Sequence, residues 1–148
     1  MDSKAPGLAE PIDFRRHLTA DGEPICARMI CRTLDLIANK WAVPILLTLA
    51  EARHQRPGRP LRFSELARAL PLITQKELTK QLRNLEAAGL VGREVHAVVP
   101  PRVEYWLTDL GVSLRPVLDE LGRWSVVNGP ALAANLQKQG AIEAEAAE

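Results

Sequence analysis

The sequence predicts a mainly α-helical fold that carries one small β-hairpin, an α+β arrangement. Apolar residues recur at helical spacing before Gly89 and again after Thr108. Between Val91 and Leu107 the apolar period changes to two, which is typical of half-buried strands. Capping residues, glycines and prolines separate these periodic segments, so the predicted elements have recognisable ends.

The chain is expected to consist of three regions. Residues 1–24 contain prolines and glycines among polar residues and predict a flexible arm. Residues 25–128 carry the periodic segments and predict one folded domain, whereas residues 129–148 predict a tail that is partly helical or disordered. No secretory signal is visible, and no apolar run approaches the roughly 20 residues needed to cross a bilayer. We therefore expect a cytoplasmic protein without a membrane partner.

Two helices are expected at the start of the domain. Ile30, Leu34 and Ile37 fall at the spacing of one helical face, and Asn39 is placed to cap a second helix. Residues 51–61 then combine turn formers with basic residues and predict an exposed basic loop.

Two more helices are expected to follow in close succession. Ser64 is placed to cap a short helix that Pro71 ends. Thr74 and Glu77 have the spacing of a capping box, in which the hydroxyl accepts from a backbone N–H and the carboxylate reaches back. Gly89 supplies the stop of this longer helix.

A hairpin and a last long helix complete the predicted order. Residues 91–99 and 102–107 alternate in the manner of strands, and Pro100 and Pro101 turn the chain between them. Thr108 can cap the final helix. A short helix, a tight turn, a longer helix and a two-stranded hairpin are the order of a winged helix-turn-helix domain.

The helix at residues 74–88 has two distinct faces. Leu78, Leu82 and Leu85 gather on one side, and the opposite side carries Lys76, Thr79, Lys80 and Arg83. Basic side chains there can neutralise phosphates or donate to guanine, and threonine can reach other base edges. An ordinary solvated helix face is the alternative explanation.

Charge is segregated along the chain although the net charge is only +1. Between Arg53 and Arg102 there are ten basic and four acidic residues, an excess of six positive charges. This concentration predicts a polyanionic partner. With the predicted fold, duplex DNA is the expected partner and the nucleoid the expected location. The residues expected to contact DNA are Lys40, Ser64, Thr74, Gln75, Lys76, Thr79, Lys80, Arg83, Arg93, His96 and Arg102.

The sequence resembles the HxlR-type winged-helix transcriptional regulators over approximately residues 28–125. The resemblance rests on an ordered series of short motifs. They are residues 33–37, Lys40-Trp41, residues 62–66, residues 73–76 with Leu78-Thr79 and Leu82-Arg83, Leu85-Glu86 with Gly89-Leu90, residues 99–105 with Leu107-Thr108, and residues 118–124.

The resemblance implies a bacterial-type transcriptional regulator that binds a pseudo-palindromic operator as a homodimer. Two-fold protein symmetry predicts two-fold operator symmetry, with half-sites about one helical turn apart. The terminal helices of such proteins form the dimer. Here the residues expected at the dimer interface are Ile30, Leu34, Leu114, Leu118, Leu121 and Trp124.

The sequence departs from the family in two places. The family commonly has a Cys-Pro pair, whose cysteine senses oxidants in some members, where this chain has Arg28-Met29. Cys26 and Cys31 flank that position, so a redox or small-molecule effector stays an open alternative, and a buried structural role is expected for Cys31. The loop at 51–61 is also longer than is usual, and its arginines could reach the DNA backbone.

Other classes of function have less support. His17, His54 and His96 are scattered, no nucleophile–base pair is apparent and no phosphate-binding glycine motif occurs, so we expect neither an enzyme nor a bound cofactor. Two cysteines with four residues between them lack the spacing of a zinc site, so no metal is expected. The remaining alternative is a protein-interaction module in which an exposed aromatic residue such as Trp106 docks a partner.

Overall fold

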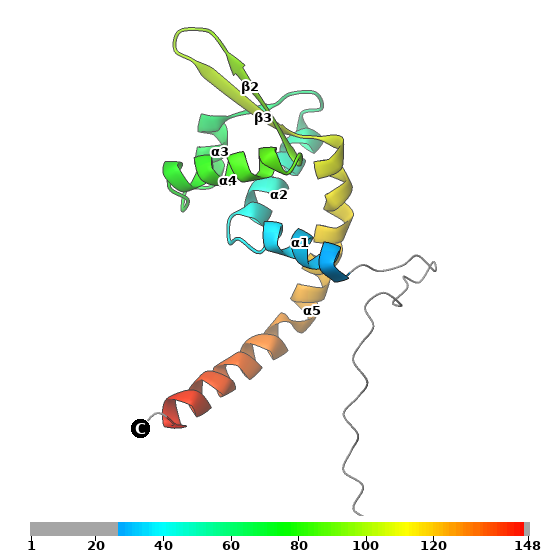
Figure 1. The fold of residues 1–148 in the computed structure, drawn as a ribbon, viewed down its shortest axis with the longest axis vertical. Coiled ribbons are helices and arrows are strands. Elements are labelled where there is room, and N and C mark those ends of the chain that lie inside the picture. Colours follow the sequence, from blue (N-terminus) through cyan, green and yellow to red (C-terminus); the bar gives the residue numbers. More distant parts are fainter. Residues whose placement is uncertain (1–26, 147–148) are drawn as a thin grey trace, which may run out of the picture. The chain divides into compact units, whose positions relative to one another are not determined.

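The computed structural model describes residues 27–146 of the chain (Figure 1). The described residues fall into two units, which divide between Asn39 and Lys40. In the first unit, α1 (Ala27–Ile37) is an α-helix of 11 residues, as the apolar spacing predicted. The predicted arm and Cys26 lie outside the described residues.

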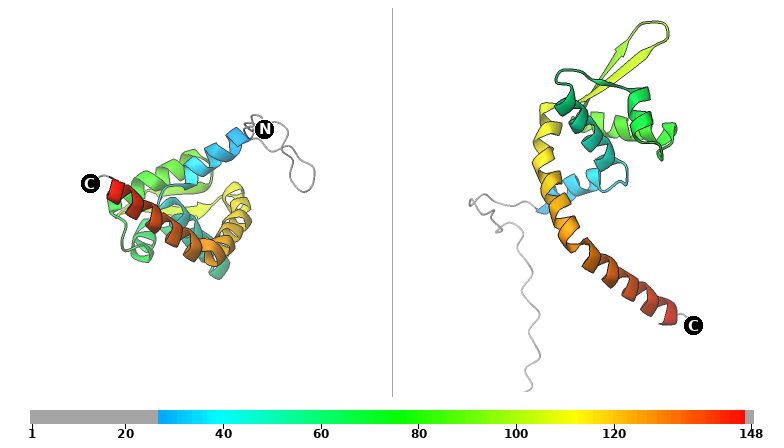
Figure 2. Two further views of the ribbon diagram at one scale, coloured as in Figure 1. Left: turned by 90° about the horizontal axis from the view of Figure 1, so that it is seen from below. Right: turned by 180° about the vertical axis from the view of Figure 1, so that it is seen from behind.

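The second unit contains the remaining elements. They are α2 (Ala42–Gln55), β1 (Leu61–Arg62), α3 (Phe63–Ala69), α4 (Gln75–Ala87), β2 (Val91–His96), β3 (Arg102–Leu107) and α5 (Asp109–Ala146). Helices α3 and α4 form the helix-turn-helix, and the β2–β3 hairpin extends beyond them as the wing (Figures 1 and 2). The predicted winged helix-turn-helix fold is confirmed.

The sheet has three antiparallel strands in the order β1-β3-β2. Within the hairpin, Val91 lies opposite Leu107 and His96 lies opposite Arg102. Strand β1 was not predicted, because two residues are too short to show a period. It pairs Leu61 with Tyr105 and so joins the start of α3 to the sheet.

The core of the second unit is built from the apolar faces of α2, α3 and α4 and from the base of the hairpin. Each leucine that is fully removed from water contributes about 1.5–3 kcal/mol. The most deeply buried residues of this core are Ala42, Ile45, Leu46 and Leu49 of α2, Leu66 of α3, Leu78, Leu82 and Leu85 of α4, and Val91, Tyr105 and Leu107 of the strands. Towards its tip the wing leaves this core, since Val95 and Val99 are exposed.

One joint connects α4, the wing and α5. Gly89, with φ of +75°, ends α4 in the left-handed region that glycine favours. The Thr108 hydroxyl donates to the Gly89 carbonyl and also accepts from the Gly111 N–H at 3.1 Å, so Thr108 caps α5 as predicted. Gly111 is buried directly against the Leu90 carbonyl, and a Cβ at this position would overlap it.

The predicted starts of two helices need correction. Helix α2 begins at Ala42 with Trp41 at its N-cap, so Asn39 does not cap it. Helix α3 begins before Ser64, and the Glu65 carboxylate accepts the Arg62 N–H at 2.8 Å instead.

Only half of the predicted capping box at α4 is present. The Thr74 hydroxyl accepts the Glu77 N–H at 3.2 Å, as predicted. The Glu77 carboxylate instead accepts from Gln81 at 2.6 Å, one turn further along the helix. Local sequence spacing shows that a cap is available, but side-chain competition within the helix decides whether it forms.

Two predicted boundaries also shift. Helix α2 continues to Gln55, so the predicted loop at 51–61 is reduced to residues 56–60 and Arg53 is helical. Helix α5 runs through the expected boundary at 129 and includes Pro130. Figure 2 shows α5 changing direction in its orange part, which contains this proline.

In the part of the chain that the structure describes, no single helix is long and apolar enough to cross a membrane. Helices α1 and α2 reach the length and apolar composition of a membrane span only when their residues are counted together.

The packing of Gly111 predicts that alanine is not tolerated there. Gly111→Ala places a methyl group against the Leu90 carbonyl, so we expect a loss of about 1–3 kcal/mol in the free energy of unfolding. Gly122→Ala, in open space on the same helix, is the matched control and should gain up to about 1 kcal/mol from helix propensity. Chemical denaturation at one protein concentration measures both. Equal stability of the two variants would contradict the close packing at Gly111.

Candidate nucleic-acid interface

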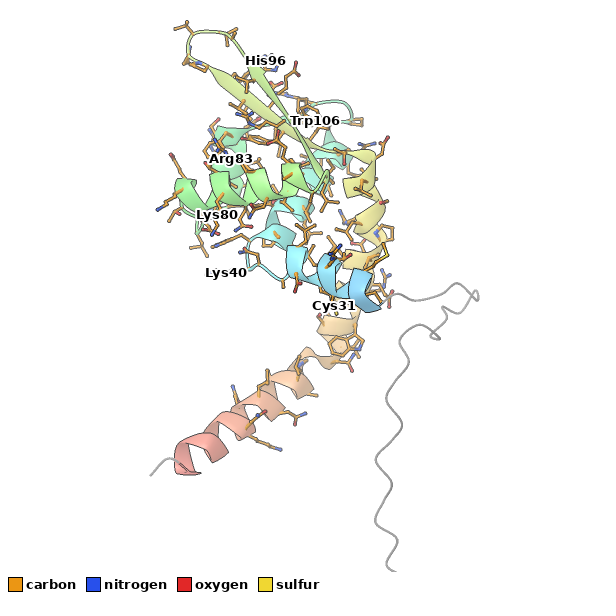
Figure 3. All side chains as sticks on the ribbon, viewed as in Figure 1. Cys31, Lys40, Lys80, Arg83, His96 and Trp106 are labelled. Carbon is orange, nitrogen blue, oxygen red and sulfur yellow. The ribbon has the colours of Figure 1, made fainter. Side chains whose placement is uncertain are left out.

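Helix α4 separates an apolar face from a cationic one. Leu78, Leu82 and Leu85 are at most 1% exposed, which anchors the helix. On the outer side Lys76, Lys80 and Arg83 are all exposed. Within the described part of the chain none of the three has a hydrogen bond or an ion pair, and Figure 3 shows Lys80 and Arg83 extending from α4. The sequence correctly predicted this division.

The other polar residues of α4 are partly engaged by the helix itself. The Thr74 hydroxyl accepts the cap hydrogen bond and Thr79 Oγ1 donates to the Gln75 carbonyl at 2.8 Å. Thr79 is only partly exposed, whereas the Gln75 side chain is exposed at the helix start. Three cations and one amide therefore remain available to an external partner.

Two predicted contacts lie outside α4. Lys40 Nζ lies 4.9 Å from the centroid of the Trp41 ring, in a cation–π contact. Ser64 is exposed in the first turn of α3. Neither side chain is buried, so both remain accessible from solvent.

The wing carries an ionic cluster across its outer face. His96 Nε2 lies 2.8 Å from Glu104 and 3.7 Å from Glu94, and Arg102 Nε lies 3.0 Å from the other Glu104 oxygen. Glu94 and Glu104 are direct cross-strand partners, and the Arg102 guanidinium beside Glu104 offsets part of their repulsion. Arg102 and His96 are thus already paired, and only Arg93 among the predicted wing residues is exposed without a partner in the described chain.

Sequence reasoning missed two polar residues of this region. Glu104 organises the wing cluster and is 15% exposed at its side chain. Gln81 is 3% exposed within α4 and is satisfied by Glu77. Alternation placed Glu104 on the outer face, but the cross-strand register that sets it opposite Glu94 was not available from the sequence.

The model of the HxlR-like helix-turn-helix family matches residues 36–132, more than half of the chain. The chain belongs to the HxlR-like helix-turn-helix family. The prediction of a DNA-binding transcriptional regulator of this family is therefore confirmed.

Relatives of the chain carry corresponding names. An uncharacterized HTH-type transcriptional regulator of Methanothermobacter thermautotrophicus is 43% identical over 109 residues, which cover 74% of this chain and 76% of that protein. One from Halalkalibacterium halodurans is 48% identical over 96 residues, covering 65% of this chain and 80% of the relative. Both relatives are named as transcriptional regulators.

Solved structures show the same fold. YtcD, an HTH-type regulator of Bacillus subtilis, is 43% identical with a TM-score of 0.59 over 68% of this chain and 95% of the other. The redox regulator HypR in its reduced form is 38% identical with a TM-score of 0.57, over 72% of this chain and 98% of the other. The reduced transcriptional regulator YodB of Bacillus subtilis is 31% identical with a TM-score of 0.57, over 68% and 91%.

The residues predicted for dimerisation differ in accessibility. Ile30, Leu34, Leu121 and Trp124 are between 47% and 51% exposed. Leu114 is partly exposed, whereas Leu118 is buried within the single chain at 7% exposure. Leu118 therefore packs within its own chain, and its role at a dimer interface stays a prediction. Helical spacing groups Leu118 with Leu114 and Leu121, but it does not show which of the three is covered by its own chain.

The predicted burial of Cys31 is wrong. Its thiol is free and the residue is exposed on α1. Met29, Ile30 and Leu34 of α1 are exposed as well, so an apolar position on this helix is not necessarily a core position.

Proposed function

We propose that this HxlR-like protein regulates transcription as a homodimer that binds a pseudo-palindromic operator. In each copy α4 enters the major groove, and the wing contacts the adjacent phosphate backbone. The observation that carries this proposal is the cationic face of α4, opposite a leucine face that is fully buried. Cations that no internal carboxylate neutralises are available to phosphates and base edges.

The proposed contacts follow from position and partner. Lys80 and Arg83 lie on consecutive turns of the exposed face, where an arginine can donate two hydrogen bonds to guanine O6 and N7. Lys76 and Gln75 lie in the first turn, and the N–H groups of that turn favour a phosphate. In the wing Arg93 is the accessible cation, so we assign the contact with the DNA phosphate backbone first to Arg93. Outside the wing, Ser64 and Lys40 are assigned as further phosphate contacts.

Removing a cation from α4 should weaken operator binding without unfolding the protein. Lys80→Ala and Arg83→Ala are each expected to reduce affinity about tenfold, because each removes a phosphate or base contact from an exposed site. The slope of affinity against salt concentration should fall by about one per lost phosphate contact. Fluorescence anisotropy with the DNA upstream of the gene, at several salt concentrations, measures both quantities.

Lys138→Ala is the matched control, since Lys138 is exposed on the far part of α5. Its affinity for DNA should equal that of the unmodified protein. If Lys80→Ala and Arg83→Ala also leave affinity and salt slope unchanged, the reading face is not on α4. Binding that is weak and insensitive to salt would favour the protein-interaction module.

The proposed dimer uses the exposed apolar side of α5. Val117, Leu121 and Trp124 follow one another at helical spacing and are 57%, 47% and 51% exposed. Large apolar side chains grouped on an exposed helix face mark an interface more often than they do an unpartnered surface. Operator symmetry requires such a two-fold contact.

A charge on this side of α5 should separate the copies. Leu121→Asp is expected to convert the dimer to monomers and to reduce operator affinity, because an aspartate would be buried without a partner in the interface. Its effect on the fold of the monomer should be small, since Leu121 is half exposed. Arg123→Asp, two residues along on a different side of the helix, is the control and should stay dimeric. Sedimentation at several concentrations measures the state, and a dimeric Leu121→Asp would contradict this interface.

A thiol-based redox response is a second candidate function. The observation that favours it is the exposed free thiol of Cys31, because accessibility is a requirement for oxidation. The chain resembles the structures of HypR, titled a redox regulator, and of YodB, which was also solved after diamide treatment. An electrophilic oxidant such as diamide takes up two electrons and two protons from two thiols, which join in a disulfide that changes the affinity for DNA.

This candidate predicts that diamide changes operator affinity through Cys31. We expect a change of about tenfold in the unmodified protein, reversed by dithiothreitol, and no change in Cys31→Ser. Cys26→Ser distinguishes a disulfide between Cys31 of two copies from one that needs Cys26. Equal affinity before and after diamide, with the disulfide confirmed by mass, would rule out a redox response of DNA binding.

A further inference from the structure

A cavity of about 470 Å³ lies between the end of α2, the loop at 56–60 and strand β3, all within the second unit. Small-molecule sites in proteins usually measure roughly 300–1,000 Å³. Leu49, Pro57 and Pro60 belong to its apolar lining. The cavity lies at the root of the wing, and the proposed DNA contacts do not use it.

One wall of the cavity is a fixed aromatic ring. Trp106 lies opposite Gly92 in the hairpin, and a Cβ on Gly92 would collide with the indole. The ring therefore lies against the backbone of β2, in space that only glycine leaves free. Trp106 is nevertheless 38% exposed and lines the cavity, so it presents an aromatic surface to a ligand. A planar ligand can stack on such a surface at a low cost in conformational entropy.

The charges on the lining favour an anion. Arg53 and Arg59 both line the cavity, and Glu94 is the one carboxylate among the described residues that do so. Arg53 Nη1 donates to the Leu107 carbonyl at 3.5 Å, which holds its guanidinium near the β3 wall. The Arg59 side chain has no hydrogen bond or ion pair within the described residues and is free to bind a ligand. Guanidinium groups pair with carboxylates through two parallel hydrogen bonds.

We propose that this cavity binds a small planar aromatic carboxylate. The ring stacks on Trp106 between the loop and the sheet, and the carboxylate accepts hydrogen bonds from Arg59 with Arg53 close by. The site would act as an effector site at the root of the wing. Ligand binding itself does not depend on the proposed DNA contacts, so the test below uses no DNA.

The test follows the indole N–H signals of the full chain by NMR, with 2-naphthoate as the probe. Trp41, Trp106 and Trp124 give three signals, and Trp106→Phe identifies the one of interest. We expect 2-naphthoate to shift the Trp106 signal in a saturable way while Trp41 and Trp124 stay in place. 2-Naphthylmethanol has the same ring system without the charge and should bind about tenfold more weakly, because it cannot form the charge-assisted hydrogen bonds.

The matched variants are Arg59→Gln and Arg56→Gln. Both replace an arginine of the same loop, but the Arg56 guanidinium lies 3.9 Å from Glu65 and does not line the cavity. Arg59→Gln should weaken naphthoate binding about tenfold, whereas Arg56→Gln should leave it unchanged. Equal binding by the two variants, equal binding of the neutral compound, or shifts that never saturate would each overturn the proposal.

Discussion

The arrangement of the second unit depends on the close approach of α5 to the start of β2. Because Gly111 has no Cβ, its backbone packs against the Leu90 carbonyl, and Thr108 links that turn to the Gly89 carbonyl at the end of α4. Three elements are thereby fixed by a few hydrogen bonds within a short distance. The helix proposed to read DNA, the wing and the helix proposed to form the dimer share this joint. A change at the joint should therefore alter stability and DNA binding together.

Electrostatic complementarity to DNA depends on which cations remain unpaired and not on the net charge. The basic middle of the sequence carries an excess of six charges, but Arg102 and Arg56 face carboxylates and Arg53 is directed to a backbone carbonyl. On α4 the three cations have no such partners within the described chain. Three unpaired cations are therefore gathered on one helix, while Arg93 and Arg59 stand singly on the wing and on the loop. The basic residues of the wing that face Glu104, Arg102 and His96, mainly stabilise the contact between strands β2 and β3. Their contribution to DNA binding is secondary.

Sequence reasoning succeeded where a signal was local and repeated. The leucine face of α4, its Thr74 cap and the hairpin all follow from period and spacing, and the structure confirms each. It failed where an outcome depends on contacts between distant segments. Strand β1 exists because Leu61 and Arg62 pair with β3. A segment of two residues has no period from which this pairing could be predicted. Leu118 is buried and Cys31 exposed although both occupy apolar helical positions, because three-dimensional packing decides which side of a helix is covered.

The proposed ligand site and the wing cluster share one residue, and this connects the two surfaces. Glu94 lines the cavity and also lies 3.7 Å from His96, opposite Glu104. A carboxylate bound at Arg59 adds negative charge on the cavity side of Glu94, in surroundings where two glutamates already face one another. Repulsion between these groups is relieved when Glu94 moves or when the basic side chains of the wing turn further towards the carboxylates. Either response changes the charge that the wing presents to DNA, so occupation of the cavity and affinity for DNA are expected to be coupled through Glu94.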